Sequence, residues 1–217
     1  MHIAIFSTHP YDRDALQRAN ANAGHQLHFF SESLNTETAP LAAGSRAVCV
    51  FVNDHLTAET LSALHANGVR LICLRSAGYD NVDLAAAQRL GLPVVRVPAY
   101  SPNAVAEHAF ALLLTLIRHT HQAHQRVHNN NFSLDGLTGF NLNGKTLAVV
   151  GAGRIGRVAA QIGRGFGCRV LAIDPYPETE WAATNGVEYV SLAEALPQAD
   201  VLSLHAPLLP STRRIGR

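Results

Sequence analysis

The sequence has few cysteines, almost no net charge and no long apolar run, and each shortage argues against a class of protein. Its three cysteines, Cys49, Cys73 and Cys168, are odd in number and lie in or beside apolar strand segments. They predict reduced core thiols of a cytoplasmic protein, and neither a disulfide framework nor a metal site. A formal net charge of +1 gives no indication of a nucleic-acid partner. No apolar run reaches transmembrane length, and residues 1–6 lack the basic start of a signal peptide, so they predict a first strand.

Apolar residues make up 47% of the 217 residues and recur as short strands that alternate with helical segments. This alternation predicts an α/β protein with two doubly wound parallel-sheet units. In the first unit we expect strands at residues 3–6, 26–30, 47–51, 70–74 and 94–97, with helices at 12–23, 58–66 and 82–90.

The pattern changes after Pro98, where one long helix is expected. Ser101 is a good helix cap and Pro102 suits the first turn, so the helix is predicted to run from Ser101 to about His128. A loop over 132–145 leads to the second unit, with strands expected at residues 147–150, 169–174, 187–190 and 199–204. Ser191 and Glu194 have the spacing of a capping box.

The second unit opens on the most informative motif of the chain, a glycine loop that follows an apolar strand. Gly151 would allow a tight turn, Gly153 would let a pyrophosphate approach the backbone, and Gly156 would let the next helix pack closely. Arg154 and Ile155 begin that helix, whose free N–H groups favour an anion. The alternative is an ordinary structural glycine turn.

Asp174 ends the strand that follows this helix. Its carboxylate can accept hydrogen bonds from the adenosine ribose hydroxyls and would repel a 2′-phosphate. The loop and the acid together predict a site for NAD rather than NADP.

Five ordered segments carry a resemblance that covers the whole chain. They are Arg75–Asp83, Val97–His108, Asn143–Thr146 with the glycine loop, Asp174–Pro177 and Leu204–Leu208. These segments resemble the D-isomer-specific 2-hydroxyacid dehydrogenases, most of all the D-lactate dehydrogenase branch. The resemblance implies a flavodoxin-like substrate domain over residues 1–100, without its C-terminal return segment. It also implies an incomplete Rossmann NAD-binding domain over 101–217, with the connecting helix at 101–128.

The resemblance assigns roles to residues on the substrate side. The backbone N–H groups of Ala77 and Gly78 match those that hold the substrate carboxylate, and a glycine-containing turn after a strand can aim amides at an anion. An ordinary strand-to-helix turn is the alternative. Tyr100 matches a substrate-side tyrosine, or is a packed aromatic between domains. The implied substrate is a small 2-oxo or 2-hydroxy acid, handled by a homodimer in the full-length family member, with no nucleic acid or membrane involved.

Residues on the nicotinamide side follow from the same resemblance. His205, Ala206 and Pro207 match the loop that borders the nicotinamide, and His205 is not the catalytic histidine by position. Glu107 and His108 invite an acid–base interpretation, but the family gives their positions a structural role.

The second half of the long helix carries a group of histidines. His121, His124 and His128 share a helical face with His119 nearby, which would allow a metal site. No cysteine or acid accompanies them, and we interpret the group as a polar helix face, with no metal.

Reduction of a 2-oxo acid also needs a cation, a general acid and a carboxylate. In the resembled family these are an arginine, a histidine and a glutamate that lie downstream of the segment that matches Leu204 to Arg217, so no catalytic residue is expected within this chain. Arg213, Arg214 and Arg217 match the start of the following helix instead. The strand at 201–204 would also present an apolar edge. We therefore expect a C-terminally truncated and inactive form of an NAD-dependent D-lactate dehydrogenase.

Two alternatives stay open at this point. One is a non-catalytic NAD-binding or partner-binding module. The other, within the enzyme class, is a glycerate, phosphoglycerate or formate dehydrogenase, which share the fold and the glycine loop.

Overall fold

The computed structural model describes residues 1–209 and residue 212, and the chain divides into two compact units, Met1–Tyr100 and Ser101–Arg217. Each unit encloses its own hydrophobic core. Arg213, Arg214 and Arg217, which carried a prediction of a further helix, lie outside the described residues. Within the described part of the chain, no helix is both long and apolar enough to span a membrane.

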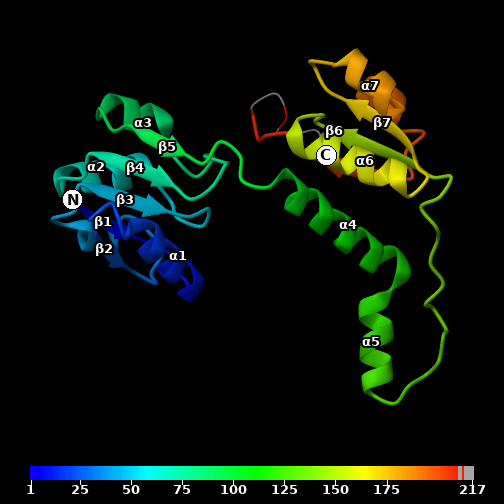
Figure 1. The fold of residues 1–217 in the computed structure, drawn as a ribbon, viewed down its shortest axis with the longest axis horizontal. Helices are drawn as coiled ribbons and strands as arrows, with labels where there is room; N and C mark the ends of the chain where they lie inside the picture. Colours follow the sequence, from blue (N-terminus) through cyan, green and yellow to red (C-terminus); the bar gives the residue numbers. More distant parts are fainter. Residues whose placement is uncertain (210–211, 213–217) are drawn as a thin grey trace. The chain divides into compact units, whose positions relative to one another are not determined.

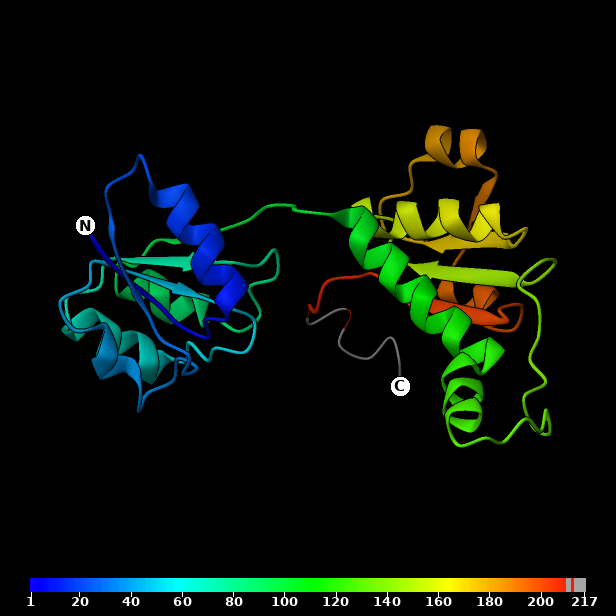
Figure 2. The ribbon, with the colours of Figure 1, turned by 60° about the horizontal axis from the view of Figure 1, so that its bottom comes forward.

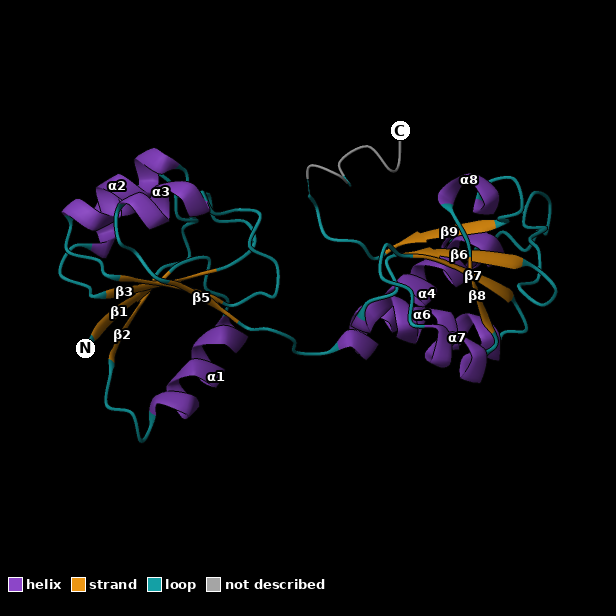
Figure 3. Cartoon of the chain, turned by 90° about the horizontal axis from the view of Figure 1, so that it is seen from above, coloured by secondary structure: helices purple, strands orange, loops and turns teal. Residues whose placement is uncertain are grey.

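The first unit is a five-stranded parallel sheet with helices on both faces (Figure 1). Its strands are β1 His2–Ile5, β2 Gln26–Phe29, β3 Ala47–Val50, β4 Leu71–Leu74 and β5 Val94–Arg96. Their order is β2-β1-β3-β4-β5, which is the flavodoxin-like order. Helix α1 (Pro10–Asn20) covers one face, and α2 (Ala58–Ala66) and α3 (Leu84–Arg89) cover the other (Figure 3). The predicted flavodoxin-like unit is therefore confirmed.

The core of this unit follows the two-residue period of its strands. Ala4 and Phe6, Val48 and Val50, and Ile72 and Leu74 are buried in one cluster, because alternate side chains of a strand point to the same face. A short 3₁₀ turn, η1 (Ala39–Ala42), adds apolar residues to this cluster.

The second unit is a four-stranded parallel sheet, also covered on both faces. Its strands are β6 Thr146–Val150, β7 Arg169–Ile173, β8 Val187–Tyr189 and β9 Val201–Leu204, in the order β8-β7-β6-β9. Counted from β6, this order is 3-2-1-4, which matches the first four strands of the Rossmann order. Helices α6 (Arg154–Gly165) and α7 (Thr179–Asn185) lie on one face, and α8 (Leu192–Ala195) lies on the other (Figure 3). The Rossmann-type prediction is confirmed.

The long helix predicted from Ser101 to His128 is wrong in one respect, because it is two helices. The first, α4 (Pro102–Arg118), is capped by Ser101 as expected; the second, α5 (Thr120–His128), takes a different direction (Figure 1). His119 separates them in the left-handed conformation, with φ 51°. The returning loop, seen from another side in Figure 2, packs Gly139 against the backbone carbonyl of Ile117. A Cβ at Gly139 would overlap that oxygen, so tertiary packing accompanies the break.

Other boundaries differ by one to three residues. Helix α1 begins at Pro10, earlier than predicted, because His9 and Asp12 form a capping box at its start. Helix α3 begins after Asp83, whose side chain accepts the Ala86 N–H at 2.8 Å. Helix α7 was not predicted, although Gly186 ends it in the left-handed conformation.

The apolar face of α4 packs within the chain. Phe110 and Ile117 are buried with residues of β6 and α6, and Leu113 and Leu114 pack against the same cluster. The chain itself therefore covers much of the apolar face of α4.

Candidate functional site

The glycine loop after β6 is shaped by contacts that only glycine allows. Gly151 has φ +92°, and a Cβ there would lie 2.7 Å from the Ala206 nitrogen and 2.8 Å from the His205 carbonyl carbon. A Cβ at Gly156 would overlap the Gly151 carbonyl oxygen. A Cβ at Gly153 would meet nothing within 4 Å, so the loop is open at this position. The three glycines therefore provide the turn, the close helix packing and the open approach that the sequence predicted.

The open side of the loop is lined by backbone donors. Gly153 caps α6, and within the described part of the chain the amides of Gly153, Arg154, Ile155 and Gly156 donate no hydrogen bond. Helix α6 runs for 12 residues, so its N-terminus also carries a partial positive charge. These groups suit a phosphate or another anion.

Asp174 is fixed beside this loop at the carboxyl end of β7. Its Oδ2 accepts the Ala152 N–H at 2.7 Å, and its Oδ1 accepts the Tyr176 N–H at 2.9 Å. A carboxylate has about four lone-pair sites, so each oxygen can still accept one more donor. Asp174 is thus oriented by the backbone and able to bind hydroxyl groups.

An arginine that the sequence analysis did not single out binds the same residue, Ala152, as Asp174 does. The Arg157 Nε donates to the Ala152 carbonyl at 2.9 Å, and its Nη2 forms an ion pair with Glu178 Oε1. Its guanidinium lies 5.2 Å from the centre of the Trp181 ring. The ion pair lowers the pKa of the Glu178 carboxyl below its ordinary value. The signal in the sequence was the position of Arg157 directly after the third glycine.

The segment after β9 borders the glycine loop from the other side. The His205 N–H donates to the Val150 carbonyl at 2.7 Å, and its Nε2 lies 2.8 Å from the Ser203 Oγ. Burial lowers the pKa of His205, so the neutral imidazole is favoured. Ala206 approaches Gly151 closely, whereas Pro207 is exposed.

In the first unit, Ala77 and Gly78 form a turn directly after β4. The Ser76 Oγ donates to the Gly78 carbonyl at 2.8 Å, and the Arg96 Nη1 donates to the Ala77 carbonyl at 2.8 Å. Both carbonyls are therefore held, while the amides of Ala77 and Gly78 donate to no partner among the described residues. Tyr100 is 66% exposed at the end of this unit. The turn presents free donors, as an anion site requires.

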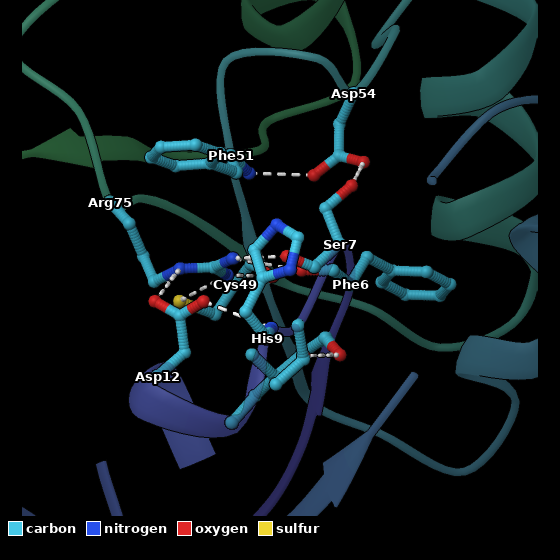
Figure 4. A network of polar contacts seen from close by, with 10 residues as sticks. Phe6, Ser7, His9, Asp12, Cys49, Phe51, Asp54 and Arg75 are labelled. Carbon is cyan, nitrogen blue, oxygen red and sulfur yellow. Dashed lines mark hydrogen bonds and ion pairs between the residues drawn. The ribbon is translucent and has the colours of Figure 1, made fainter. Parts of the chain in front are cut away.

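Arg75 ties three strands together just before this turn (Figure 4). Its Nη2 donates to the carbonyls of Phe6 at 3.0 Å and Ser7 at 3.1 Å, and its Nη1 donates to the Cys49 carbonyl at 3.3 Å. Its Nε lies 3.6 Å from Asp12 Oδ1, which links α1 to the sheet. The guanidinium thus gathers carbonyl groups from the ends of parallel strands.

Asp54 accepts hydrogen bonds in a second network, whereas Arg75 donates them in the first (Figure 4). This fully buried carboxylate accepts the Ser7 hydroxyl at 2.6 Å and the amides of Leu34 at 2.7 Å and Phe51 at 2.6 Å. A buried charge with this many donors is well compensated. The two networks hold the loops at the carboxyl edge of the first sheet.

The cysteines differ in burial. Cys168 is buried, but Cys49 and Cys73 are only half-buried, so the expectation of three core thiols is right for Cys168 alone. Burial raises the pKa of Cys49, and it raises the pKa of Cys73 to about 11.

The tempting acid–base and metal candidates on α4 and α5 lie on the surface. Glu107 and His108 are exposed, and the rings of His124 and His128 stack with centroids 6.4 Å apart. Within the described residues, no group of three or more His, Cys, Asp or Glu side chains could hold a metal ion.

Residues 3–196 match the family model described as D-isomer specific 2-hydroxyacid dehydrogenase, catalytic domain. The chain is 51% identical over 210 residues to the D-lactate dehydrogenase of Escherichia coli K12, an alignment that covers 97% of this chain and 64% of the relative. It is 46% identical to a 2-hydroxyacid dehydrogenase homolog of Zymomonas mobilis, over 99% of this chain and 65% of the relative. The chain belongs to the D-isomer specific 2-hydroxyacid dehydrogenase family. It spans about two thirds of the length of these relatives.

Solved structures agree with this assignment. The apo-structure of D-lactate dehydrogenase from Escherichia coli matches 98% of this chain and 67% of that one, with a TM-score of 0.88 and 50% identity. D-lactate dehydrogenase from Aquifex aeolicus, complexed with NAD and lactic acid, matches with a TM-score of 0.83 and 35% identity, over 97% of this chain and 62% of that one.

Proposed function

We propose that the chain provides the cofactor-binding and carboxylate-binding parts of an NAD-dependent D-lactate dehydrogenase, a cytoplasmic enzyme that reduces pyruvate with NADH. The observation that carries the proposal is the open glycine loop, whose four amides have no partner among the described residues, beside an oriented Asp174. The family assignment and the similarity to D-lactate dehydrogenases support it.

The residues fit a dinucleotide. The amides from Gly153 to Gly156 would hold the pyrophosphate, and Asp174 would accept the adenosine ribose hydroxyls. His205, Ala206 and Pro207 would border the nicotinamide side. The bound nicotinamide would supply the hydride, while the protein supplies position and exclusion of water.

The substrate in this proposal is a small 2-oxo acid. The amides of Ala77 and Gly78, which have no partner in the described part of the chain, would bind its carboxylate, and Tyr100 would lie on the substrate side. We favour lactate over glycerate, phosphoglycerate and formate because of the motifs around Tyr100 and Asp174 and the 51% identity to a D-lactate dehydrogenase. A homodimer is proposed for the whole protein.

The 217-residue chain on its own is proposed to be inactive, because the family resemblance implies an arginine, a glutamate and a histidine that none of its residues match. The test is an assay of NADH oxidation with pyruvate by the purified chain. Measurable turnover would contradict the proposal. Reading the coding DNA past the Arg217 codon is the companion test: a continuing frame that encodes these three residues supports the dehydrogenase.

A second candidate, a non-catalytic NAD-binding or partner-binding module, is favoured by one observation. Strand β9 pairs only with β6 among the described strands, and Leu202 and Leu204 on it are 38% and 54% exposed. An exposed apolar edge can pair with another chain. NAD binding without turnover, together with a true stop codon after Arg217, would favour this candidate.

A further inference from the structure

The ion pair between Arg157 and Glu178 lies beside the carboxylate that we assign to the adenosine ribose. A single residue, Ala152, connects the two features: its N–H binds Asp174 at 2.7 Å, and its carbonyl accepts the Arg157 Nε at 2.9 Å. The Asp174 carboxylate and the Arg157 guanidinium are therefore both held by one residue at the rim of the proposed ribose site.

An arginine at such a place ordinarily favours NADP, because a guanidinium binds a 2′-phosphate through paired N–H donors. Arg157 alone would therefore predict binding of NADP, whereas Asp174 predicts binding of NAD. The structure shows that the guanidinium is held on one side: Nε donates to Ala152, Nη2 pairs with Glu178, and the ring of Trp181 lies under the group.

The local charge also disfavours a phosphate. Asp174 and Glu178 contribute two negative charges and Arg157 one positive charge, so these three side chains together carry a net charge of −1. A phosphate monoester carries about −1.5 to −2 charges at pH 7 and would be repelled. The side chain of Glu178 is 59% exposed and that of Arg157 is 29% exposed, so water screens the pair and its removal should cost the fold little.

We propose that Glu178 determines cofactor selectivity by holding Arg157 away from the 2′-phosphate of NADP. This inference rests on the proposed NAD site. It assigns a role in selectivity to a residue outside the glycine loop and four positions after Asp174. Without Glu178, the charge of Arg157 loses its counter-ion while Ala152 and Trp181 still hold the guanidinium at the rim, and NADP becomes an acceptable ligand.

The test measures the dissociation constants of NAD⁺ and NADP⁺ for the purified 217-residue chain by titration calorimetry. Glu178→Gln is expected to lower the ratio of the NADP⁺ constant to the NAD⁺ constant by about tenfold or more, as one gained charge-assisted contact implies. Glu180→Gln is the matched control, because Glu180 is an exposed carboxylate two residues away without an ion pair in the described part of the chain. It should leave the ratio unchanged.

A double variant, Arg157→Met with Glu178→Gln, tests whether Arg157 is the group that binds the 2′-phosphate when Glu178 is replaced. If Arg157 is the group that binds the phosphate, the double variant should discriminate against NADP⁺ again. An equally low ratio in both variants would overturn the role of Arg157. Should Glu178→Gln fail to fold, Glu178→Ala replaces it. The chain has a single tryptophan, Trp181, so its fluorescence reports whether the structure around Arg157 is intact.

The possible failures are distinguishable. A parent chain that binds neither dinucleotide would contradict the proposed NAD site itself. A parent chain that binds NAD⁺, with an unchanged ratio in a folded Glu178→Gln variant, would overturn only the role of Glu178.

Discussion

At the scale of single residues, the first two glycines of the loop have different roles, one in the fold and one in the approach of a ligand. Gly151 has a conformation and neighbours that exclude any side chain, whereas Gly153 lies in open space. The fold therefore requires the first glycine, and ligand approach requires the second. Both tasks were predictable from the sequence, because the spacing of the motif encodes them locally.

Gly151→Ala should lower the free energy of unfolding by at least ~2 kcal/mol, because alanine at φ +92° is strained and its Cβ would collide with Ala206. Gly165→Ala is the matched control. Gly165 ends α6 with open space around its Cβ position, so alanine there should be neutral or stabilising by up to ~1 kcal/mol. Urea denaturation measures both values. Equal effects of the two substitutions would contradict this account of the loop.

Cys73 should be a poorly reactive thiol at neutral pH. Its pKa of about 11, against an ordinary value of 9.0, makes the thiolate about a hundredfold rarer than in the unfolded chain. Iodoacetamide labelling at pH 7.5, with and without urea and followed by peptide mass spectrometry, should show about this slowing. Because the folded-state pKa is the higher one, raising the pH from about 9 to 11 should also destabilise the fold. Labelling of native Cys73 at the unfolded rate would refute the assignment.

At the scale of elements, local signals predicted the starts of α4 and α8 well. Ser101 caps α4, and Ser191 forms a capping box with Glu194 at the start of α8, because these residues act within one turn of their own position. The break at His119 had no such signal. It coincides with a contact between Gly139 and the Ile117 carbonyl, which are distant in sequence.

Replacing His119 tests whether this break is a strained point. His119→Gly should stabilise the chain by ~0.5–1 kcal/mol, since a left-handed conformation costs a non-glycine residue about 1 kcal/mol. His121→Gly, two residues further in α5, should destabilise by a similar amount because it weakens a regular helix. Urea denaturation of both variants provides the comparison. If His119→Gly is as destabilising as His121→Gly, the two helices form one continuous helix in solution.

The edge of β9 should promote self-association. Leu204 is 54% exposed on a strand with one free edge among the described residues. Leu204→Lys should lower the weight-average mass of the chain at tens of micromolar in sedimentation experiments, because charge on an edge opposes strand pairing. Leu134→Lys is the control, since Leu134 is 80% exposed but lies in a loop. A similar decrease in both variants would indicate general solubility instead of edge pairing.

At the scale of the whole molecule, the chain consists of two parallel-sheet units with separate cores. The fold class was predictable because alternating strands and helices permit few arrangements. Much of the candidate site was predictable too, because it lies at strand ends and in turns that motifs mark. The pairing of Arg157 with Glu178 was not, since it depends on how α6 and the start of α7 pack against each other.

The central claim is that the glycine loop and Asp174 form an NAD site, and calorimetric titration of the 217-residue chain with NAD⁺ and NADP⁺ tests it most directly. The parent chain should bind NAD⁺ at least about tenfold more tightly than NADP⁺. Asp174→Ala should weaken NAD⁺ binding and bring the two affinities close together. Asp174→Asn controls for the two backbone amides that Asp174 also binds, because its carbonyl can still accept one of them. No heat of binding at millimolar NAD⁺, or an unchanged preference in Asp174→Ala, would contradict the account.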